Sequence, residues 1–394
     1  MKDSSTKEKI KEILTRGVED IFVKESLEKK LESGKELRVK LGIDPTGSTI
    51  HLGRASVLRK AKAFQDLGHR IVLIVGDFTA TIGDPSDKLE KRPMLTKEAV
   101  KKNMENYKDI LGKIIDLDKV EIVYNSQWLS NLNLSEISEL AESFSVQQMV
   151  ARRNFKDRID KGQEISLREF LYPLMQGYDS VKVLADIEIG GFDQLFNLKA
   201  GRIIQKHYSM PEQDVLTTQM LEGTDGRKMS TSWGNVINIT DGPVDMFGKV
   251  MSIKDDLIEK YFVLCTDLPE DEIKEVLKKE NPKDQKIVLA EEVVRLYHGD
   301  RKALSAKDSF ILTFQKKEIP DNLEEVVVGK GERLSGILID RNLVSSKTEW
   351  RRLVSNGAVH LMEDKNLVQE FDFEVDKDIT IKIGKRRFIK IKVK

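Results

Sequence analysis

Three short segments carry most of the side chains in this sequence that could do chemistry. The first, residues 44–54, reads DPTGSTIHLGR and lies between an apolar stretch and a predicted helix. A helix N-terminus presents free backbone N–H groups and a partial positive charge, so it suits a polyphosphate. His51 can donate a hydrogen bond there, Gly53 permits close approach, and Arg54 adds a fixed positive charge. The same residues would also fit an ordinary connection between a strand and a helix.

The second segment, residues 223–232, reads GTDGRKMSTS and is small and polar. We expect a mobile surface loop in which Lys228 pairs with phosphate while the hydroxyls of Ser230, Thr231 and Ser232 add hydrogen bonds. A loop of this kind could close as charge develops on a pyrophosphate. Taken alone, a lysine on a polar loop is usually just a solvated lysine.

The third segment is a polar stripe on a predicted helix. Tyr172, Gln176 and Asp179 follow the spacing i, i+4 and i+7, so a phenol, an amide and a carboxylate share one helix face. Residues 189–194, IGGFDQ, come soon after it. The stripe could line a pocket, or it could form a buried polar network between a helix and a sheet.

The elements that must position these segments alternate between helix and strand. Apolar periodicity predicts a helical region over the first 35 residues and a helix over roughly 55–67. Short apolar runs predict strands at residues 39–43, 71–75, 120–124 and 183–189. Strands that alternate with helices indicate a parallel sheet covered on both faces. We therefore predict an α/β fold with a Rossmann-like domain over residues 1–240.

The pattern changes after residue 240. An amphipathic stripe predicts a small all-helical domain over residues 241–330. Residues 331–394 show two short helices and then an alternation of apolar and basic residues, which predicts an α+β domain ending in a strand. From Ile381 to Lys394, seven of fourteen residues are Lys or Arg and none is acidic. This basic run fits either a solvated edge strand or a phosphate-binding surface.

Composition excludes several classes of protein. The 66 basic and 66 acidic residues cancel, which gives no global case for nucleic-acid binding. Cys265 is the only cysteine and no two histidines have metal-ligand spacing, so neither a disulfide nor a structural zinc site is encoded. No apolar run approaches the roughly 18 to 20 residues that cross a membrane, and no secretion signal is visible. We expect a cytoplasmic protein without a membrane partner.

The three segments together resemble a known family. Residues 51–54 and 228–232 resemble the paired H-[IL]-G-H and K-M-S-K-S signatures of class I aminoacyl-tRNA synthetases, in the same order and about 175 residues apart. The stripe at Tyr172 and the segment 189–194 are similar to the amino-acid pocket of bacterial-type tyrosyl-tRNA synthetases. The tail resembles an S4-like RNA-binding domain. This resemblance covers nearly the whole chain and implies a catalytic domain, a small helical anticodon-arm domain and an S4-like domain.

The resemblance also implies an activity and a role for each residue. Such an enzyme activates L-tyrosine with ATP to tyrosyl-adenylate and then loads tRNA(Tyr), with Mg2+ travelling on ATP and no metal held by the protein. The residues implied at the phosphates, which include the catalytic ones, are Thr46, His51, Gly53, Arg54, Lys228 and Thr231. Those implied near the adenosine are Asp44, Gly191 and Asp193, and those at the tyrosine are Lys40, Asp84, Tyr172, Gln176, Asp179 and Gln194. The implied tRNA contacts are Lys347, Arg351, Arg352, Lys385, Arg386 and Arg387.

Within that pattern, Asp179 would accept a hydrogen bond from the phenolic hydroxyl of the substrate, and Asp84, Tyr172 and Gln176 would hold its ammonium group. The segment near residues 125–145 is expected, by family, to form the interface of a homodimer.

Three positions depart from the family pattern. Arg54 stands in place of a second histidine, Thr231 in place of a second lysine, and Lys40 where many members have a tyrosine that binds the substrate hydroxyl. Lys40 could donate to the phenolic oxygen, pair with Asp179 or point outward. Three other functions stay open: a tryptophanyl enzyme, an RNA-binding factor that has lost catalysis, and a nucleotidyltransferase that uses no tRNA.

Overall fold

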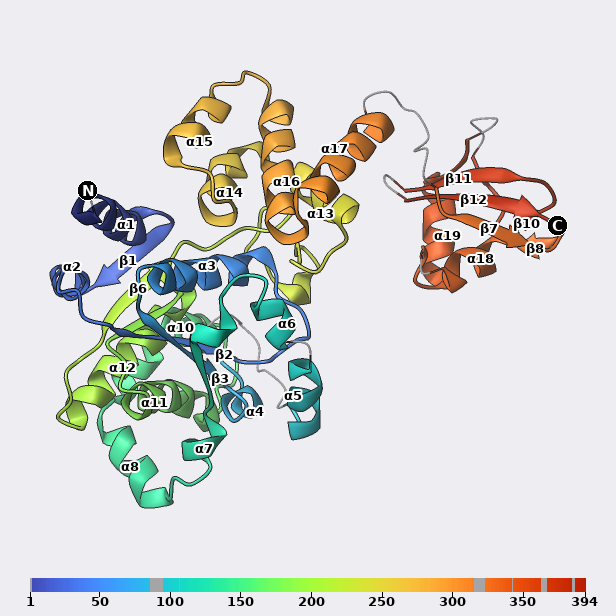
Figure 1. The fold of residues 1–394 in the computed structure, drawn as a ribbon. Coiled ribbons are helices and arrows are strands. Elements are labelled where there is room, and N and C mark those ends of the chain that lie inside the picture. Colours follow the sequence, from blue (N-terminus) through green and yellow to red (C-terminus); the bar gives the residue numbers. More distant parts are fainter. Residues whose placement is uncertain are drawn as a thin grey trace. The chain divides into compact units, whose positions relative to one another are not determined.

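The computed structural model describes residues 2–85, 95–105, 107–314, 323–341, 343–362, 367–384 and 387–394. The chain forms two compact units, Met1–Ala303 and Leu304–Lys394. The first unit is a sheet with helices on both faces, joined by further helices, and the second is a smaller α+β unit (Figure 1). The α/β fold class predicted from the sequence is confirmed.

The sheet of the first unit has its strands in the order β1-β6-β5-β2-β3-β4. These strands are β1 Val18–Phe22, β2 Arg38–Ile43, β3 Arg70–Val75, β4 Val120–Tyr124, β5 Ile187–Gly191 and β6 Asp214–Thr218. Neighbouring strands are parallel, except that β1 runs antiparallel to β6. Because β2 pairs with β3 on one side and with β5 on the other, the order reverses between β2 and β5. Open α/β sheets bind ligands at such a point, beyond the carboxyl ends of the strands.

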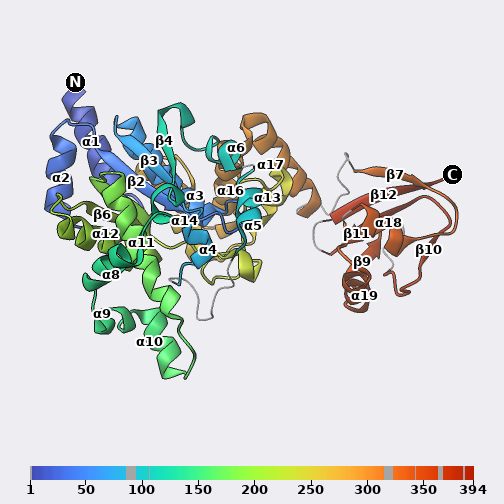
Figure 2. The same ribbon diagram turned by 90° about the horizontal axis from the view of Figure 1, so that it is seen from below.

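Helices cover both faces of this sheet. Helix α3 lies on one face, and helices α11 and α12 lie together on the other (Figure 2). The helices around the sheet are α1 Lys2–Thr15, α2 Lys24–Glu32, α3 Leu52–Asp66, α4 Thr79–Ile82, α5 Lys97–Met104, α6 Tyr107–Leu111, α7 Ser126–Leu129, α8 Leu134–Glu142, α9 Val146–Val150, α10 Arg153–Asp160, α11 Leu167–Lys182 and α12 Leu195–His207. Helices α13 Pro243–Met251, α14 Ile258–Cys265, α15 Glu270–Leu277, α16 Pro282–His298 and α17 Asp300–Phe314 follow.

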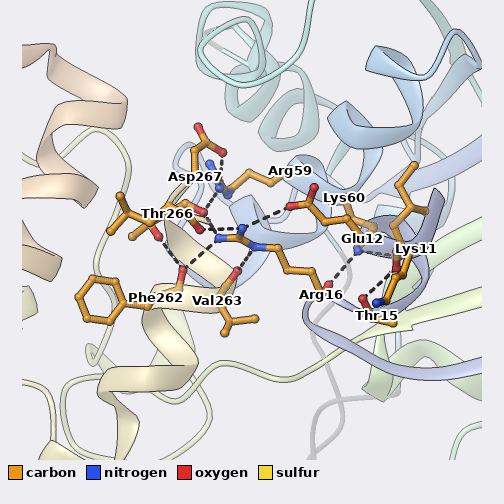
Figure 3. A network of polar contacts seen from close by, with 12 residues as sticks. Lys11, Glu12, Thr15, Arg16, Arg59, Lys60, Phe262, Val263, Thr266 and Asp267 are labelled. Atoms are coloured by element: carbon orange, nitrogen blue, oxygen red, sulfur yellow. Dashed lines mark hydrogen bonds and ion pairs between the residues drawn. The ribbon is translucent and has the colours of Figure 1, made fainter. Parts of the chain in front are cut away.

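Cations join α1, α3 and α14 (Figure 3). The Arg16 guanidinium donates to the carbonyl oxygens of Val263 (3.1 Å), Thr266 (2.8 Å) and Leu268 (2.8 Å), at the C-terminal end of α14. Lys60 of α3 donates to the carbonyl oxygen of Arg16 (2.8 Å) and to one in the last turn of α1. Helix C-termini carry unpaired carbonyls and a partial negative charge, so these cations satisfy both helix ends. They thereby anchor the helix whose N-terminus carries His51.

The second unit has a four-stranded sheet in the order β7-β12-β11-β9 and a two-stranded sheet of β10 and β8. Its elements are β7 Glu325–Val328, β8 Glu332–Arg333, α18 Leu334–Asp340, α19 Lys347–Ser355, β9 Val359–Leu361, β10 Glu374–Val375, β11 Ile379–Ile383 and β12 Arg387–Val393. Ile389 and Ile391 of β12 are fully buried in a core that also contains Trp350. The last strand, which the alternation of apolar and basic residues predicted, is confirmed.

Two element predictions are wrong. The first 35 residues are not wholly helical, because β1 lies between α1 and α2. The strand predicted at 183–189 begins only at Ile187, because Val183 caps the end of α11. The helices of the predicted 241–330 domain fall largely within the first unit, so its separation from the 1–240 domain stays a prediction. Among the residues with described structure, no helix is both long and apolar enough to cross a bilayer.

Candidate active site

A cavity of about 500 Å³ opens at the carboxyl ends of β2 and β5, where the strand order reverses. Fourteen of the fifteen residues expected around tyrosine and ATP line it, and only Lys40 does not. The lining members are Asp44, Thr46, His51, Gly53, Arg54, Asp84, Tyr172, Gln176, Asp179, Gly191, Asp193, Gln194, Lys228 and Thr231. Residues far apart in the sequence therefore meet because parallel strands end at the same edge of the sheet.

The turn after β2 places the first motif at the start of α3. His51 is the N-cap residue of α3, and the backbone N–H of Leu52 donates to the carbonyl of Ile237 at 2.9 Å. Arg54 Nη2 donates to Thr46 Oγ1 at 3.1 Å. The guanidinium and the helix N-terminus thus lie on one wall of the cavity, which is the arrangement that a polyphosphate needs.

Asp44 is held by residues from two other elements. Its carboxylate accepts a hydrogen bond from Thr79 Oγ1 at 2.7 Å and one from the Tyr172 hydroxyl at 2.8 Å. A Cβ atom at Gly76 would lie 1.9 Å from Asp44 Oδ1, so only glycine fits beside this carboxylate. Neither Gly76 nor Thr79 was predicted from the sequence, because nothing in their local pattern shows that they face Asp44.

The amino-acid stripe lies on α11, as predicted, with Tyr172 and Asp179 buried and Gln176 facing the cavity. A capping box fixes the start of the helix: the Ser166 side chain accepts from the backbone N–H of Glu169, whose own side chain accepts from the N–H of Ser166. Across the cavity, Asp84 accepts a hydrogen bond from Gln194 Nε2 at 2.7 Å.

Asp179 is the C-terminal member of the stripe, and its side chain is buried. Trp128 Nε1 donates to its Oδ1 at 2.7 Å and Asn125 Nδ2 to its Oδ2 at 3.2 Å. Burial raises the pKa of Asp179 to about 7, while the positive charge of Lys40 and these two hydrogen bonds act in the opposite direction. Asn125 and Trp128 were missed from the sequence, although their position directly after the predicted strand at residues 120–124 was a usable signal.

The 223–232 segment contributes Lys228, whose Nζ lies 2.9 Å from Asp193 Oδ2. The sequence predicts a mobile surface loop at residues 223–232. In the structure, the side chain of Asn235 holds this loop by hydrogen bonds. The Asn235 side chain accepts from the backbone N–H of Ser230 at 2.9 Å and donates to the carbonyl of Lys228 at 3.0 Å and to Asp225 at 2.7 Å. Thr231 lies at the exposed rim in a short 3-10 helix.

Lys40 does not occupy any of the three positions considered from the sequence. Its side chain is fully buried, and its Nζ lies 2.9 Å from Glu188 Oε1. It also donates to the carbonyl oxygen of Gln176 and to Ser180 Oγ, both at 2.7 Å. The expected direct contact with tyrosine is therefore replaced by a buried ion pair behind the cavity wall.

The expected tRNA contacts fall on the second unit. Lys347, Arg351 and Arg352 are exposed on α19, where Lys347 and Arg351 share one face at a spacing of i and i+4. Arg387 instead pairs with Glu349 at 3.3 Å. Lys385 and Arg386 lie outside the described residues.

Comparison with known proteins identifies the family. Residues 32–315 match the model of the tRNA synthetases of class I (W and Y). A tyrosine–tRNA ligase of Thermotoga maritima is 45% identical over 392 residues, which cover 98% of each chain. One of Carboxydothermus hydrogenoformans is 45% identical over 398 residues, which cover 96% of this chain and 97% of the relative.

A solved structure agrees in fold. A C-terminally truncated mitochondrial tyrosyl-tRNA synthetase of Aspergillus nidulans superimposes with a TM-score of 0.64 at 21% identity, covering 79% of this chain and 100% of that one. The matches in sequence extend through both units. This chain belongs to the class I aminoacyl-tRNA synthetases for tryptophan and tyrosine, and within them to the tyrosine–tRNA ligases.

Proposed function

We propose that the cavity between β2 and β5 is where this ligase activates tyrosine with ATP before the tyrosyl group passes to tRNA(Tyr). The observation that carries this proposal is the set of charges that lines the cavity: the buried carboxylate of Asp179, the cations Arg54 and Lys228, and the N-terminus of α3. We assign the part beside Asp179 to the phenol of tyrosine, and the part beside Arg54 and Lys228 to the triphosphate of ATP.

At the tyrosine end, Asp179 would accept the hydrogen bond of the phenolic hydroxyl, and Asp84, Tyr172 and Gln176 would surround the ammonium group. Phenylalanine would leave the buried Asp179 carboxylate without that donor. Burying an unpaired polar group is costly, so the pocket would select against phenylalanine without an editing site. Gln194, which donates a hydrogen bond to Asp84, would lie beside the reacting carboxylate of tyrosine.

At the ATP end, the reaction needs stabilised charge rather than a protein nucleophile. The tyrosine carboxylate attacks the α-phosphorus of ATP, and the bond from that phosphorus to the pyrophosphate oxygen breaks. Lys228 would move from Asp193 to the departing pyrophosphate, which would leave Asp193 to accept hydrogen bonds from the ribose. Thr46, His51, Arg54 and Thr231 would contact the remaining phosphate oxygens, with Mg2+ carried by ATP.

The tRNA would meet the second unit through Lys347, Arg351 and Arg352. Its terminal ribose hydroxyl would attack the carbonyl carbon of tyrosyl-adenylate, and the bond from that carbon to the phosphate oxygen would break, so that AMP leaves. Phosphate contacts of this kind add affinity that falls steeply with salt.

We also propose a homodimer through the surface around α8 to α11. Leu134 and Leu167 are each 79% exposed and Val146 is 69% exposed. Helices α8 and α11, which carry Leu134 and Leu167, also contribute to an apolar groove lined by Phe78, Leu129, Leu132, Ile137, Leu140, Leu171, Leu174 and Met175. Exposed apolar side chains gathered on one surface mark protein contacts. A second copy of this chain is the occupant, and a monomeric mass at micromolar concentration in sedimentation equilibrium would overturn this.

The activity is tested by ATP–pyrophosphate exchange with each of the twenty amino acids offered separately. Exchange that depends on tyrosine alone is the expected result, and it would show that Arg54 and Thr231 support the reaction. A folded protein that binds tRNA but exchanges with no amino acid would instead identify an RNA-binding factor without catalysis.

A further inference from the structure

A fully buried ion pair lies behind the tyrosine end of the cavity. Lys40 and Glu188 are register partners on the parallel strands β2 and β5, and both side chains are 0% exposed. Removing two charges from water carries a large penalty, and apolar residues of similar size are often at least as stable in such places. Stability is therefore a weak explanation for this pair.

The pair is connected to α11 through hydrogen bonds on both of its charges. Lys40 Nζ donates to the Gln176 carbonyl and to Ser180 Oγ, both at 2.7 Å. Glu188 accepts from Ser180 Oγ at 3.1 Å and from Gln176 Nε2 at 3.0 Å. Gln176 is thus held at its backbone by one member of the pair and at its side chain by the other.

The packing of α12 leaves room for this network. Gln213 Nε2 donates a further hydrogen bond to Glu188. A Cβ atom at Gly201 of α12 would lie 2.2 Å from that nitrogen and 2.6 Å from Ser180 Oγ. Only glycine at this position lets the helix approach without displacing the partners of the ion pair.

The contact with Glu188 fixes the orientation of the Gln176 amide. An ionised carboxylate can only accept hydrogen bonds, so it selects the NH2 group of Gln176. The amide oxygen of Gln176 then remains for the cavity that this residue lines. An oxygen acceptor is what an ammonium group requires, whereas an NH2 group at that place would repel it.

The same pair acts on Asp179 through its charges. Burial raises the pKa of Asp179, the charge of Lys40 lowers it, and the charge of Glu188 raises it by less than Lys40 lowers it. The remaining groups that face this carboxylate are the donors Asn125 and Trp128 of the β4–α7 segment. Lys40 therefore favours the ionised form of Asp179, which is the form that accepts from a phenol.

We propose that Lys40 and Glu188 are positioning residues for tyrosine recognition: together they turn the Gln176 amide toward the substrate ammonium and keep Asp179 ready for the phenolic hydroxyl, while neither touches the substrate. This inference rests on the proposed function of the cavity and deepens it.

The test is a double variant, Lys40→Met with Glu188→Gln, which keeps side-chain size and removes both charges. Tyrosine-dependent pyrophosphate exchange is followed from about pH 6 to about pH 9.5. The acid limb of kcat/KM for tyrosine should move to higher pH, and a shift of about one unit from a pKa of about 7 lowers kcat/KM about fivefold at pH 7 and about tenfold well below that pH. The loss should shrink at high pH, the tyrosine-over-phenylalanine ratio should fall, and the KM for ATP should stay within about twofold.

Glu188→Gln alone should shift the acid limb of kcat/KM in the opposite direction. This single variant tests the inference if the double variant does not fold. It removes the charge that raises the pKa of Asp179, so the acid limb should move to lower pH. The tyrosine KM should rise because the Gln176 amide is no longer held in one orientation. An acid limb that does not move in this variant would overturn the inference.

The control is Arg158→Met with Glu169→Gln, which removes another buried ion pair that also reaches α11. It should lower the melting temperature but leave the acid limb and the amino-acid preference unchanged. If the Lys40–Glu188 variants behave like this control, the pair is only structural. Absence of tyrosine exchange in the wild-type protein would count against the proposed function instead.

Discussion

At the scale of one residue, the ionised form of Asp179 that the site needs makes the folded protein less stable. Its folded pKa of about 7 lies above the ordinary value of 3.8. Between these values the folded protein binds a proton that the unfolded chain has released, so this group's contribution to the free energy of unfolding falls as pH rises from about 4 to about 7. Recognition of a phenol needs the ionised form, which the fold disfavours.

Replacing Asp179 by Asn should therefore remove both the selectivity and its pH dependence. A hydrogen bond to a charged group is worth about 1.5–3 kcal/mol, so the tyrosine-over-phenylalanine ratio of kcat/KM should fall about 10- to 150-fold. The wild-type kcat/KM for tyrosine should decline below about pH 7, and that of the variant should not. Asp77→Asn is the matched control, since Asp77 caps α7 outside the cavity. An unchanged ratio in the Asp179 variant would contradict the pocket assignment.

Lys228→Ala tests the ATP end. We expect kcat to fall about 100- to 1,000-fold, because a donor aimed at developing charge acts mainly in the transition state, while the tyrosine KM should change little. Lys260→Ala is a close match, since both lysines are 28% exposed and both pair with a carboxylate at 2.9 Å. Equal effects of the two substitutions on kcat would assign Lys228 a structural role.

Nearly every residue that the sequence predicted at the site lines the cavity, but the partner that each one has in the fold was not predicted. Lys40 was assigned to the substrate, and its true partner Glu188 could not be found, because that pairing depends on β5 lying beside β2. Gly76 was missed for the same reason: its closeness to Asp44 exists only once β3 is placed against β2.

At the scale of elements, the junction of α1, α3 and α14 depends on a lysine in an unusual state. Burial lowers the pKa of Lys60 to about 7 from its ordinary 10.5. Between about pH 7 and pH 10.5 the unfolded chain binds a proton that the folded protein does not, so the free energy of unfolding should rise with pH over that window.

Lys60→Met should remove this rise, which amounts to at most about 1.4 kcal/mol per pH unit. Urea unfolding of both proteins at several pH values from about 7 to about 9 measures the difference in slope. Lys62→Met, an exposed position on the same helix, should keep the wild-type slope. If the Lys60 variant keeps it too, the pH dependence has another source.

The elements that the sequence predicted well are those whose type follows from their own residues, without a partner far away in the sequence. The fully apolar run of β3 identifies a strand buried on both faces. Residues 18–22 were instead included in a helix, because Ile21 and Phe22 continue the apolar spacing of the preceding residues. What makes them a strand is the pairing with β6, whose residues come about 200 positions later in the chain.

At the scale of the whole molecule, the two units should divide the reaction. Removing residues 331–394 should leave tyrosine-dependent pyrophosphate exchange within about threefold and lower tRNA charging by at least about 100-fold, because the exposed cations of α19 are lost. Both activities can be measured on one preparation. Undiminished charging by the truncated protein would mean that residues 331–394 do not bind the tRNA.

The pairing of β1 with β6 has a consequence for synthesis on the ribosome. Val18 lies opposite Thr218, so the edge strand waits for a partner that is made almost 200 residues later. At about 5–20 residues per second, the interval is roughly 10 to 40 s. During that time β1 can pair wrongly with other chains, and its two acidic residues, Glu19 and Asp20, oppose such pairing by charge repulsion. Replacing both by apolar residues should therefore increase aggregation of the nascent protein more than it changes the stability of the finished one.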